Sequence, residues 1–384
     1  MIRPLAPAFA LALLVPLPLL GQKPAGFVVR LGSDTIAVER FTRSATRLEG
    51  DVVNRVPRTR VTHYVADLGP DGRVIRFEFT SRPVAAAPGG LPTIHAVETL
   101  DGDTAIVTLT LNESSQTMRV PTARVAVPML NGSYALHEQA VMQFRRANTD
   151  SMPFDWVAAG AAQAYESWVA RAGRDSVAIG YFGAPIYARA EADGRLLALD
   201  GRATTVKVRV DRIAAPDVQR TARDFAALDA SGHAVGQLSP RDTVRATVEQ
   251  AHLMVDYGRP MKRGRTIFGG IVPWGQVWRT GANAATQLST DADLVMGGKR
   301  IPAGTYTLWT VPSADGATLI INSQSGQWGT DYDGSKDFAR LELKTEPVDR
   351  PVEQFTIAIE PRGGGAALLL TWDRTRYVMP FTAK

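Results

Sequence analysis

The stretch that decides the fold class is Arg73-Val74-Ile75-Arg76-Phe77-Glu78-Phe79-Thr80. Its apolar side chains at positions 75, 77 and 79 alternate with charged or polar ones, so the two sets fall on opposite faces of a strand. The same alternation recurs at 107–111 and 206–210, and turn residues such as Asp101-Gly102-Asp103 separate the segments. One buried and one wet face per strand predicts an antiparallel sheet in the N-terminal half.

Two stretches depart from this alternation. Residues 155–172 carry apolar side chains at helical spacing and are followed by Gly173, and residues 216–228 carry a second such stripe. We therefore expect a curved antiparallel sheet with two short helices near 155–172 and 216–228. Such a sheet can enclose an apolar cavity, so an apolar ligand in the N-terminal sheet is one expectation.

The length of 384 residues suggests two domains. Residues 230–247 have the composition of a linker, which places the boundary near Ser239-Pro240 and predicts domains at 22–239 and 240–384. Short strands are expected after the boundary, near 250–257, 286–290, 305–311, 317–322, 339–344, 352–360, 366–372 and 376–381. Strands of this length and spacing predict a β-sandwich or jelly-roll-like domain, and a mainly β protein overall.

The first residues have the layout of a secretory signal peptide. Arg3 supplies a positive charge, residues 8–20 are almost wholly apolar, and the chain turns polar at Gln22. We expect a signal peptide at 1–21 and an exported protein, periplasmic or extracellular, with an uncleaved anchor as the alternative. Since no later segment approaches eighteen consecutive apolar residues, no transmembrane segment is expected after cleavage.

The composition excludes several classes of site. The chain has no Cys, which rules out disulfides, zinc–thiolate sites and cysteine catalysis. The net charge is +5, but only seven of the 43 cationic side chains are Lys and the Arg residues are dispersed among acids, so we expect no nucleic-acid partner. No phosphate-binding glycine loop and no nucleophile-elbow motif occurs, and no cofactor is expected.

The densest motif lies at 257–286, where cations, tryptophans and glycines are interspersed. It contains Tyr257, Arg259, Lys262, Arg265, Trp274, Trp278, Arg279 and Asn283. Forked guanidinium donors beside flat indole faces suit a small polar or anionic ligand, such as a carboxylate, a phosphate or a sugar. The alternative is structural, because Arg stacked on Trp also pins a long loop onto a sandwich.

The string Y-G-R-P-x-x-R-G-R-x-I-F-G-x-x-V-P-x-G-x-x-W-R-T-G-A-N at 257–283 resembles the bacterial family called domain of unknown function 2911. The likeness continues through 297–308, Trp328-Gly329, Tyr332, Asp337 and Arg340, and covers about residues 240–384. The resemblance implies an exported β-rich domain and supplies no established activity. Relatives commonly have Glu after the Asn, where this chain has Ala284, so any acid–base work of that carboxylate is missing here.

Three aspartates form a weak candidate for a metal site. Asp331, Asp333 and Asp337 alternate along the chain as in a calcium loop, but Lys336 stands where such a loop needs Gly. A solvated turn is the simpler interpretation, and we expect no metal there.

The five histidines lie far apart and show no zinc-ligand spacing. His252 is a candidate general base, and Asp256, four residues on and on the same strand face, is a candidate to orient it. No nucleophile is evident, and a strand histidine with a satisfied ring is the plainer interpretation. Three hypotheses follow: small-ligand binding, a purely structural or interaction role, and metal-independent hydrolysis with His252 and Asp256. Binding ranks slightly above the structural role, and both rank above catalysis. Whether the chain is an enzyme stays open at this point.

Overall fold

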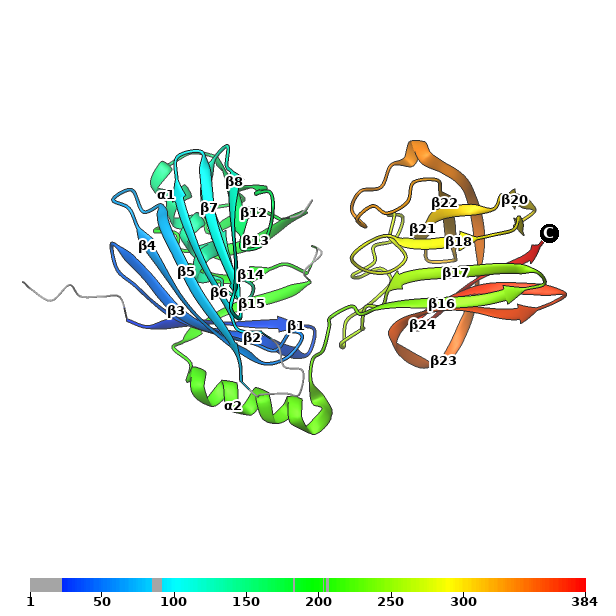
Figure 1. The fold of residues 1–384 in the computed structure, drawn as a ribbon, viewed down its shortest axis with the longest axis horizontal. Helices are drawn as coiled ribbons and strands as arrows, with labels where there is room; N and C mark the ends of the chain where they lie inside the picture. The colour runs from blue at the N-terminus through cyan, green and yellow to red at the C-terminus, as the bar shows by residue number, and fades with distance from the viewer. Residues whose placement is uncertain (1–22, 85–91, 182–183, 203, 205–206) are drawn as a thin grey trace, which may run out of the picture.

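The computed structural model describes residues 23–84, 92–181, 184–202, 204 and 207–384. Its described part confirms a mainly β protein, with two large sheets, almost wholly antiparallel, and two α-helices (Figure 1). The signal peptide expected at 1–21 lies outside the described residues. Among the described residues, none of the helices has the length and apolar character needed to cross a membrane.

The first sheet has 15 strands in the order β8-β7-β6-β5-β4-β3-β2-β1-β15-β14-β13-β12-β11-β10-β9. Their bounds are β1 (Ala25–Leu31), β2 (Asp34–Arg43), β3 (Arg47–Asn54), β4 (Arg60–Leu68), β5 (Val74–Pro83), β6 (Ile94–Asp101), β7 (Thr104–Leu111), β8 (Ser114–Pro121), β9 (Val125–Met129), β10 (Ser151–Ala158), β11 (Tyr165–Arg171), β12 (Ser176–Tyr181), β13 (Ala184–Ala190), β14 (Leu196–Asp200) and β15 (Val208–Ala214). All neighbours pair antiparallel except β9 and β10, which are parallel because helix α1 (Ala135–Ala147) connects them.

The two helices pack on opposite faces of the first sheet. α1 contacts β9, β10 and β11 and shares the main core with Phe27 and Val29, whereas α2 (Val218–Leu228) contacts β2 and β3 and packs on Val28 and Val38. Because adjacent residues of β1 face opposite ways, one strand serves both clusters. The helix predicted near 216–228 is therefore present, and it begins at an N-cap in which Asp217 accepts a hydrogen bond from Arg220 N.

The helix predicted at 155–172 is wrong. This segment forms β10 and β11, joined by a turn at Gly160, whose φ is 90°. Ser167 and Val169 face inward while Glu166 and Trp168 face outward. Burial thus alternates as in a strand, although the aromatic residues are spaced as in a helix. The sequence does not predict helix α1, which the structure contains instead. Its buried face includes polar as well as apolar residues, so the sequence shows no clear apolar stripe there.

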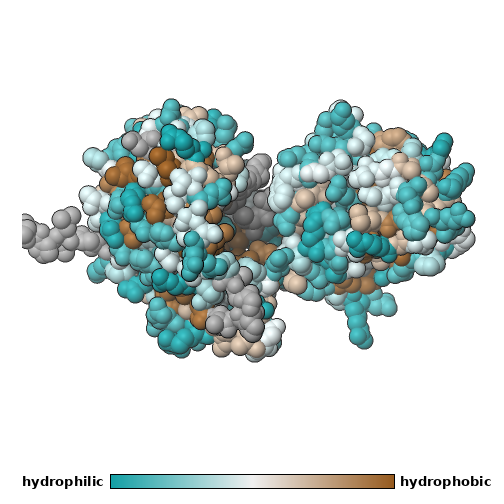
Figure 2. Space-filling model, in the orientation of Figure 1, coloured by the Kyte–Doolittle hydropathy of each residue, from teal (hydrophilic) through white to brown (hydrophobic). Residues whose placement is uncertain are grey.

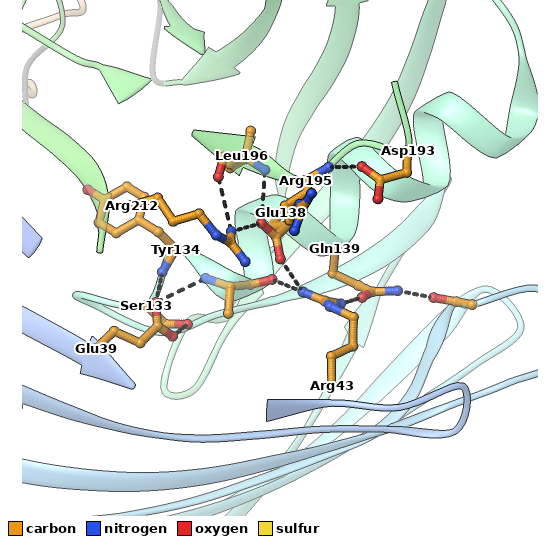
Figure 3. Close-up of polar contacts among 12 residues, drawn as sticks. Glu39, Arg43, Ser133, Tyr134, Glu138, Gln139, Asp193, Arg195, Leu196 and Arg212 are labelled. Carbon is orange, nitrogen blue, oxygen red and sulfur yellow. Dashed lines mark hydrogen bonds and ion pairs between the residues drawn. The ribbon is translucent and has the colours of Figure 1, made fainter. Parts of the chain in front are cut away.

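Those buried polar residues form a hydrogen-bonded network, shown in Figure 3. Glu138 accepts bonds from Arg43 at 3.0 Å, from Arg212 at 2.5 Å and from Leu196 N at 2.8 Å. Glu39 accepts bonds from the Tyr64 and Ser133 hydroxyls, both at 2.6 Å, and from the first amides of α1. Burial raises the pKa of Glu39, while these hydrogen bonds oppose the rise. Each carboxylate is thus compensated by donors that the fold supplies.

The second sheet has nine strands in the order β16-β17-β18-β21-β22-β23-β24-β19-β20. Their bounds are β16 (Arg241–Val248), β17 (Ala251–Gly258), β18 (Thr286–Thr290), β19 (Leu294–Met296), β20 (Lys299–Ile301), β21 (Gly304–Pro312), β22 (Ala317–Asn322), β23 (Asp337–Arg362) and β24 (Gly365–Ala383). The long β23 pairs with β22 near its start and with β24 over most of its length, so it joins two layers around one apolar core. This is the sandwich-like unit that the sequence predicts.

The segment 230–247 is only partly a linker. A helical turn at Asp229–His233 follows α2, and the rest of the segment from Arg241 onward is strand β16, which pairs with β17 along its whole length. Its apolar Val244 packs against the core of the second sheet, while polar neighbours keep its composition linker-like. The break between the two sheets lies between Ala214 and Arg241.

Candidate functional site

The loop at 259–285, between β17 and β18, has an irregular but firmly held backbone. Trp278 exchanges two main-chain hydrogen bonds of 2.8 Å with Thr310 of β21. Arg263, Thr280 and Asn283 have left-handed φ values of 48°, 50° and 63°. For the β-branched Thr280 this conformation is costly, and it is held by burial and by a 2.7 Å bond between the Thr280 and Thr310 hydroxyls. Strained backbone of this kind gathers at functional sites, which directs attention to this loop.

Two of the predicted ligand-binding residues belong to the core. Tyr257 is 1% exposed, and its hydroxyl accepts a 3.0 Å hydrogen bond from Ile357 N. Trp278 stacks on Trp372, meets Phe355 edge-on and donates its ring N–H to Gly281 O at 3.1 Å. Their roles in the described structure are therefore those of packing residues under the loop.

Two of the predicted cations are held by acidic partners. Arg259 donates to Asp242 at 2.8 Å and to Thr356 at 3.1 Å, and Lys262 donates to Asp373 at 2.6 Å. These pairs tie the loop to β16 and to the long strands β23 and β24. A ligand anion at either cation would have to compete with a carboxylate already in place.

The loop also contacts the first sheet through Arg263. Its guanidinium donates to Asp34 at 2.5 Å and to Val235 O at 3.0 Å, and its main-chain O accepts a 3.3 Å bond from Ser33 N. Gly32 makes this approach possible, because a Cβ at that position would lie 1.9 Å from Arg263 O. The β1–β2 turn and the loop thus form a close junction between the two sheets.

Three further cations gather at this junction, and each has only main-chain oxygens as partners among the described residues. Lys207, just before β15, donates to Ile271 O at 3.0 Å. Arg265 donates to Lys262 O at 2.9 Å and to Met261 O at 2.5 Å. Arg279 donates to Asn283 O at 3.3 Å. We call Lys207, Arg265 and Arg279 the junction cations.

The electrostatics of the junction cations are dominated by burial and by their like charges. Burial, together with the charges of Arg265 and Arg279, lowers the pKa of Lys207 to about 8. Burial also lowers the pKa of Arg265, against the opposing charges of Glu353 and Asp34, and that of Arg279, against the opposing charge of Asp331. Lys207 also has a left-handed φ of 57°. A cation that is half-buried among like charges is an arrangement that a bound anion stabilises.

The remaining predicted residues lie beside this cluster. Trp274 is 45% exposed, stacks on Phe268 and packs over Gly269, in the same turn as Ile271, which accepts from Lys207. Asn283 is exposed, and its amide donates to Ser239 O at 3.4 Å. Trp328, which is 53% exposed, precedes Gly329, against which Arg279 packs. The junction therefore offers flat apolar surface next to its cations.

The sequence predicts Arg265 and Arg279 as ligand-binding residues, but it does not predict Lys207. Lys207 lies about fifty residues before the loop, in the N-terminal half, and no motif surrounds it. Its only distinction in the sequence is that Lys is scarce. The contact with Ile271 arises from the way the two sheets meet, which no local pattern encodes.

The three aspartates proposed as a metal site have separate protein partners. Asp333 accepts from Ser335 N and Oγ, and Asp337 accepts from Tyr332, Asn322 and Arg340. Asp331 accepts from Thr330 at 3.1 Å. Across the described part of the chain, no group of three or more His, Cys, Asp or Glu side chains is arranged to hold a metal ion.

The pairing of His252 with Asp256 is wrong. The His252 ring bonds Asp291 at 2.8 Å, whereas Asp256 is paired with Arg241. The reason is strand geometry: at about 3.3 Å per residue, positions four apart on one face are about 13 Å apart. The partner of His252 comes instead from the neighbouring strand, just after the end of β18.

Comparison with known proteins gives a family for the second sheet only. Residues 239–381 match the family described as protein of unknown function (DUF2911). The C-terminal region is thus similar to a family whose description assigns no activity. The match confirms the resemblance predicted from the loop motif, over nearly the same residues. No curated protein matches the chain.

Two solved structures share a weak likeness of fold. One is a DUF1089 family protein from Pseudomonas aeruginosa, 10% identical, with 43% of this chain and 89% of that chain covered and a TM-score of 0.32. The other is a beta-barrel-like protein of domain of unknown function DUF1849 from Brucella abortus, 14% identical, with 50% and 94% covered and a TM-score of 0.33. Likeness at this level assigns no function to the chain.

Proposed function

We propose that this protein binds a small anionic ligand at the junction cations Lys207, Arg265 and Arg279. The observation that carries the proposal is that these three charges meet with no acidic side chain bonded to any of them in the described structure. The other cations of the loop, Arg259, Lys262 and Arg263, each have a carboxylate. The contrast within one loop favours a site over a merely structural charge cluster.

The donor set indicates the class of ligand. Arg265 and Arg279 offer planar forks that suit a carboxylate or phosphate, and Lys207 adds a compact charge. Trp274 offers an exposed indole for a planar or sugar-like part of the same molecule. A phosphorylated or carboxylated small molecule with a flat or cyclic body fits this arrangement best.

Titration calorimetry with inorganic phosphate and with citrate tests the proposal. We expect binding to the full chain, loss of at least tenfold in affinity for Lys207→Met and for Arg279→Gln, and weakening by salt. Lys299→Met is the matched control, because Lys299 also donates to a main-chain oxygen, that of Phe338 at 2.7 Å, but lies away from the junction. Absence of binding by every anion, or equal affinity in all variants, would leave the loop a structural element.

Export belongs to this proposal as well. The motif at 1–21 supports secretion into the periplasm or beyond, where the ligand would be an envelope or environmental metabolite. Mass spectrometry of the protein from the periplasmic fraction tests export. Cleavage after Gly21 should give a chain that begins at Gln22. An apolar ligand inside the N-terminal sheet stays a prediction, as does the lack of a nucleic-acid partner.

A further inference from the structure

A second feature of the C-terminal unit lies at the other end of its strands. β17 runs toward the first sheet, so its beginning at Ala251–His252 is remote from the junction (Figure 1). There an open groove of about 640 Å³ follows β16, β17, β18 and the start of β21. Its polar lining includes Arg245, Thr247, His252, Ser289, Asp291 and Thr305.

Asp291 fixes the His252 ring in one tautomer. One carboxylate oxygen accepts the His252 main-chain N–H at 2.7 Å, and the other bonds ring Nδ1 at 2.8 Å. These bonds hold the pKa of Asp291 below its ordinary value, so the carboxylate stays charged and only accepts. Nδ1 must therefore donate, which leaves the lone pair of the neutral ring on Nε2.

Two other histidines of the described residues with carboxylate partners, the exposed His63 and the half-buried His95, show what is particular to His252. His63 bonds Asp51 through Nδ1 at 2.9 Å, but its Nε2 faces Glu49 at 3.6 Å. His95 uses Nε2 itself to bond Glu78 at 3.0 Å. Among the contacts of the described residues, Nε2 of His252 has no such partner, and the ring borders the groove.

Two further groups of the groove are available to a ligand. Arg245 is exposed and has no hydrogen bond or ion pair within the described residues, so its guanidinium is free to hold an anion. The Ser289 and Thr305 hydroxyls bond each other at 3.1 Å, and only one of the two protons is used in that bond. The other is available to a carbonyl oxygen.

We propose that this groove hydrolyses small carboxylic esters that carry an anionic group, with His252 as general base, Asp291 as its positioning residue and Arg245 as the anchor of the anion. His252 Nε2 takes a proton from a water molecule as the water oxygen adds to the ester carbonyl carbon. The bond from that carbon to the alcohol oxygen then breaks, and the proton passes from the imidazolium to the departing alkoxide. Ser289 or Thr305 donates to the carbonyl oxygen as its negative charge develops.

The experiment compares two esters on the full chain in phosphate-free buffer: 4-nitrophenyl hydrogen succinate, which is anionic, and 4-nitrophenyl acetate, which is neutral. We expect His252→Gln to lower kcat/KM at least about 100-fold for the succinate. Arg245→Gln is expected to lower it about tenfold for the succinate and to leave the acetate unchanged. His63→Gln is the matched control, an exposed histidine with an Asp partner, and should retain the full rate.

Asp291→Asn separates positioning from structure. It should lower kcat with little change in KM, and the ring ¹⁵N spectrum of His252 should show the loss of the single tautomer. A wild-type rate in His252→Gln, or no hydrolysis of either ester by the wild-type chain, would overturn the proposal. The two proposals fail separately, because ester hydrolysis in the groove is measured without phosphate and phosphate affinity at the junction is measured without an ester.

Discussion

The buried charges of the first sheet and the junction cations are arranged in opposite ways. Around α1, Glu39 and Glu138 are almost fully buried, and each meets several donors from different elements (Figure 3). At the junction, Lys207, Arg265 and Arg279 are half-buried, and within the described residues their side chains bond only carbonyl oxygens. The first arrangement is complete without a ligand, whereas the second leaves three cations with no carboxylate bonded to them in the described structure. The partners of a charged side chain therefore distinguish a structural network from a binding site better than the type of residue does.

The largest effect is expected inside the first sheet. Glu138→Ala leaves the buried Arg43 and the half-buried Arg212 without their carboxylate, and should reduce the free energy of unfolding by about 3–5 kcal/mol. Urea denaturation of the full chain measures it. Glu191→Ala, which breaks the exposed pair with Arg195, is the control and should cost less than about 1 kcal/mol. Equal losses in the two variants would contradict the structural role of the network.

Glu98 differs from the other buried carboxylates of the first sheet, because neither of its buried oxygens has a hydrogen-bond partner among the described residues. It lies between Phe77 and Val107, and burial raises its pKa from 4.5 to about 8. Below pH 4.5 both folded and unfolded chains hold the proton; as the pH rises to about 8, the unfolded chain gains free energy by ionising, so stability is lost. Glu98→Gln should be more stable than the wild type by about 2–4 kcal/mol at pH 8, with the gap closing at pH 5.

Urea denaturation at pH 5 and at pH 8 checks this expectation. Glu113→Gln, at an exposed position, is the control and should show no pH-dependent gap. A constant difference between Glu98→Gln and the wild type would mean that Glu98 ionises inside the sheet as readily as in the unfolded chain, and would contradict the raised pKa.

The contact between the sheets should have an intermediate effect. Gly32→Ala places a methyl group against Arg263 O at a left-handed position, and should cost about 1–2 kcal/mol and weaken phosphate binding as the loop shifts. Gly298→Ala is the control. Gly298 is also left-handed but has open space around it, so this variant should lose only the stability that a left-handed Ala costs. Titration calorimetry measures the phosphate affinity of both variants. Equal affinities would show that phosphate binding does not depend on the close contact between Gly32 and Arg263.

The smallest effect on stability is expected at the cations themselves. Lys207→Met removes a half-buried charge and should stabilise the ligand-free chain by about 1 kcal/mol at pH 7. Because the folded-state pKa of Lys207 is lowered, the penalty is full below about pH 8 and disappears as the pH rises above 10.5. Thermal melts across this range measure it, and a variant less stable than the wild type at pH 7 would count against an uncompensated cluster.

The sequence predicts the sheets better than the helices, for a physical reason. Strand alternation is local, so the pattern at 73–80 identifies β5, although Ile75 is 48% exposed and Val74 takes the buried place beside a register shift. Helix α1 is not predicted from an apolar stripe, because Glu138 and Gln139 are buried against partners far away in the sequence, on strand β2 and in the β4–β5 turn. Only the tertiary structure supplies those partners.

The sequence predicts only part of the candidate site. The loop motif at 257–283 identifies the right segment, and two of the junction cations come from it. Lys207 and Asp291 come from elsewhere in the chain, because one depends on the contact between two sheets and the other on pairing between strands. The surface pattern gives no further guide, since on the face in Figure 2 hydrophobic residues of the C-terminal unit lie in small groups among polar ones.

The most direct measurement is the pKa of Lys207 by NMR of ¹³C-labelled lysine, with the signal assigned through Lys207→Met and the titration repeated in phosphate. We predict a pKa of about 8 for Lys207 in the free protein and a clear rise when phosphate binds, because the anion stabilises the charged form. A Lys207 that titrates near 10.5 without ligand and does not respond to phosphate or citrate would contradict an anion site at the junction.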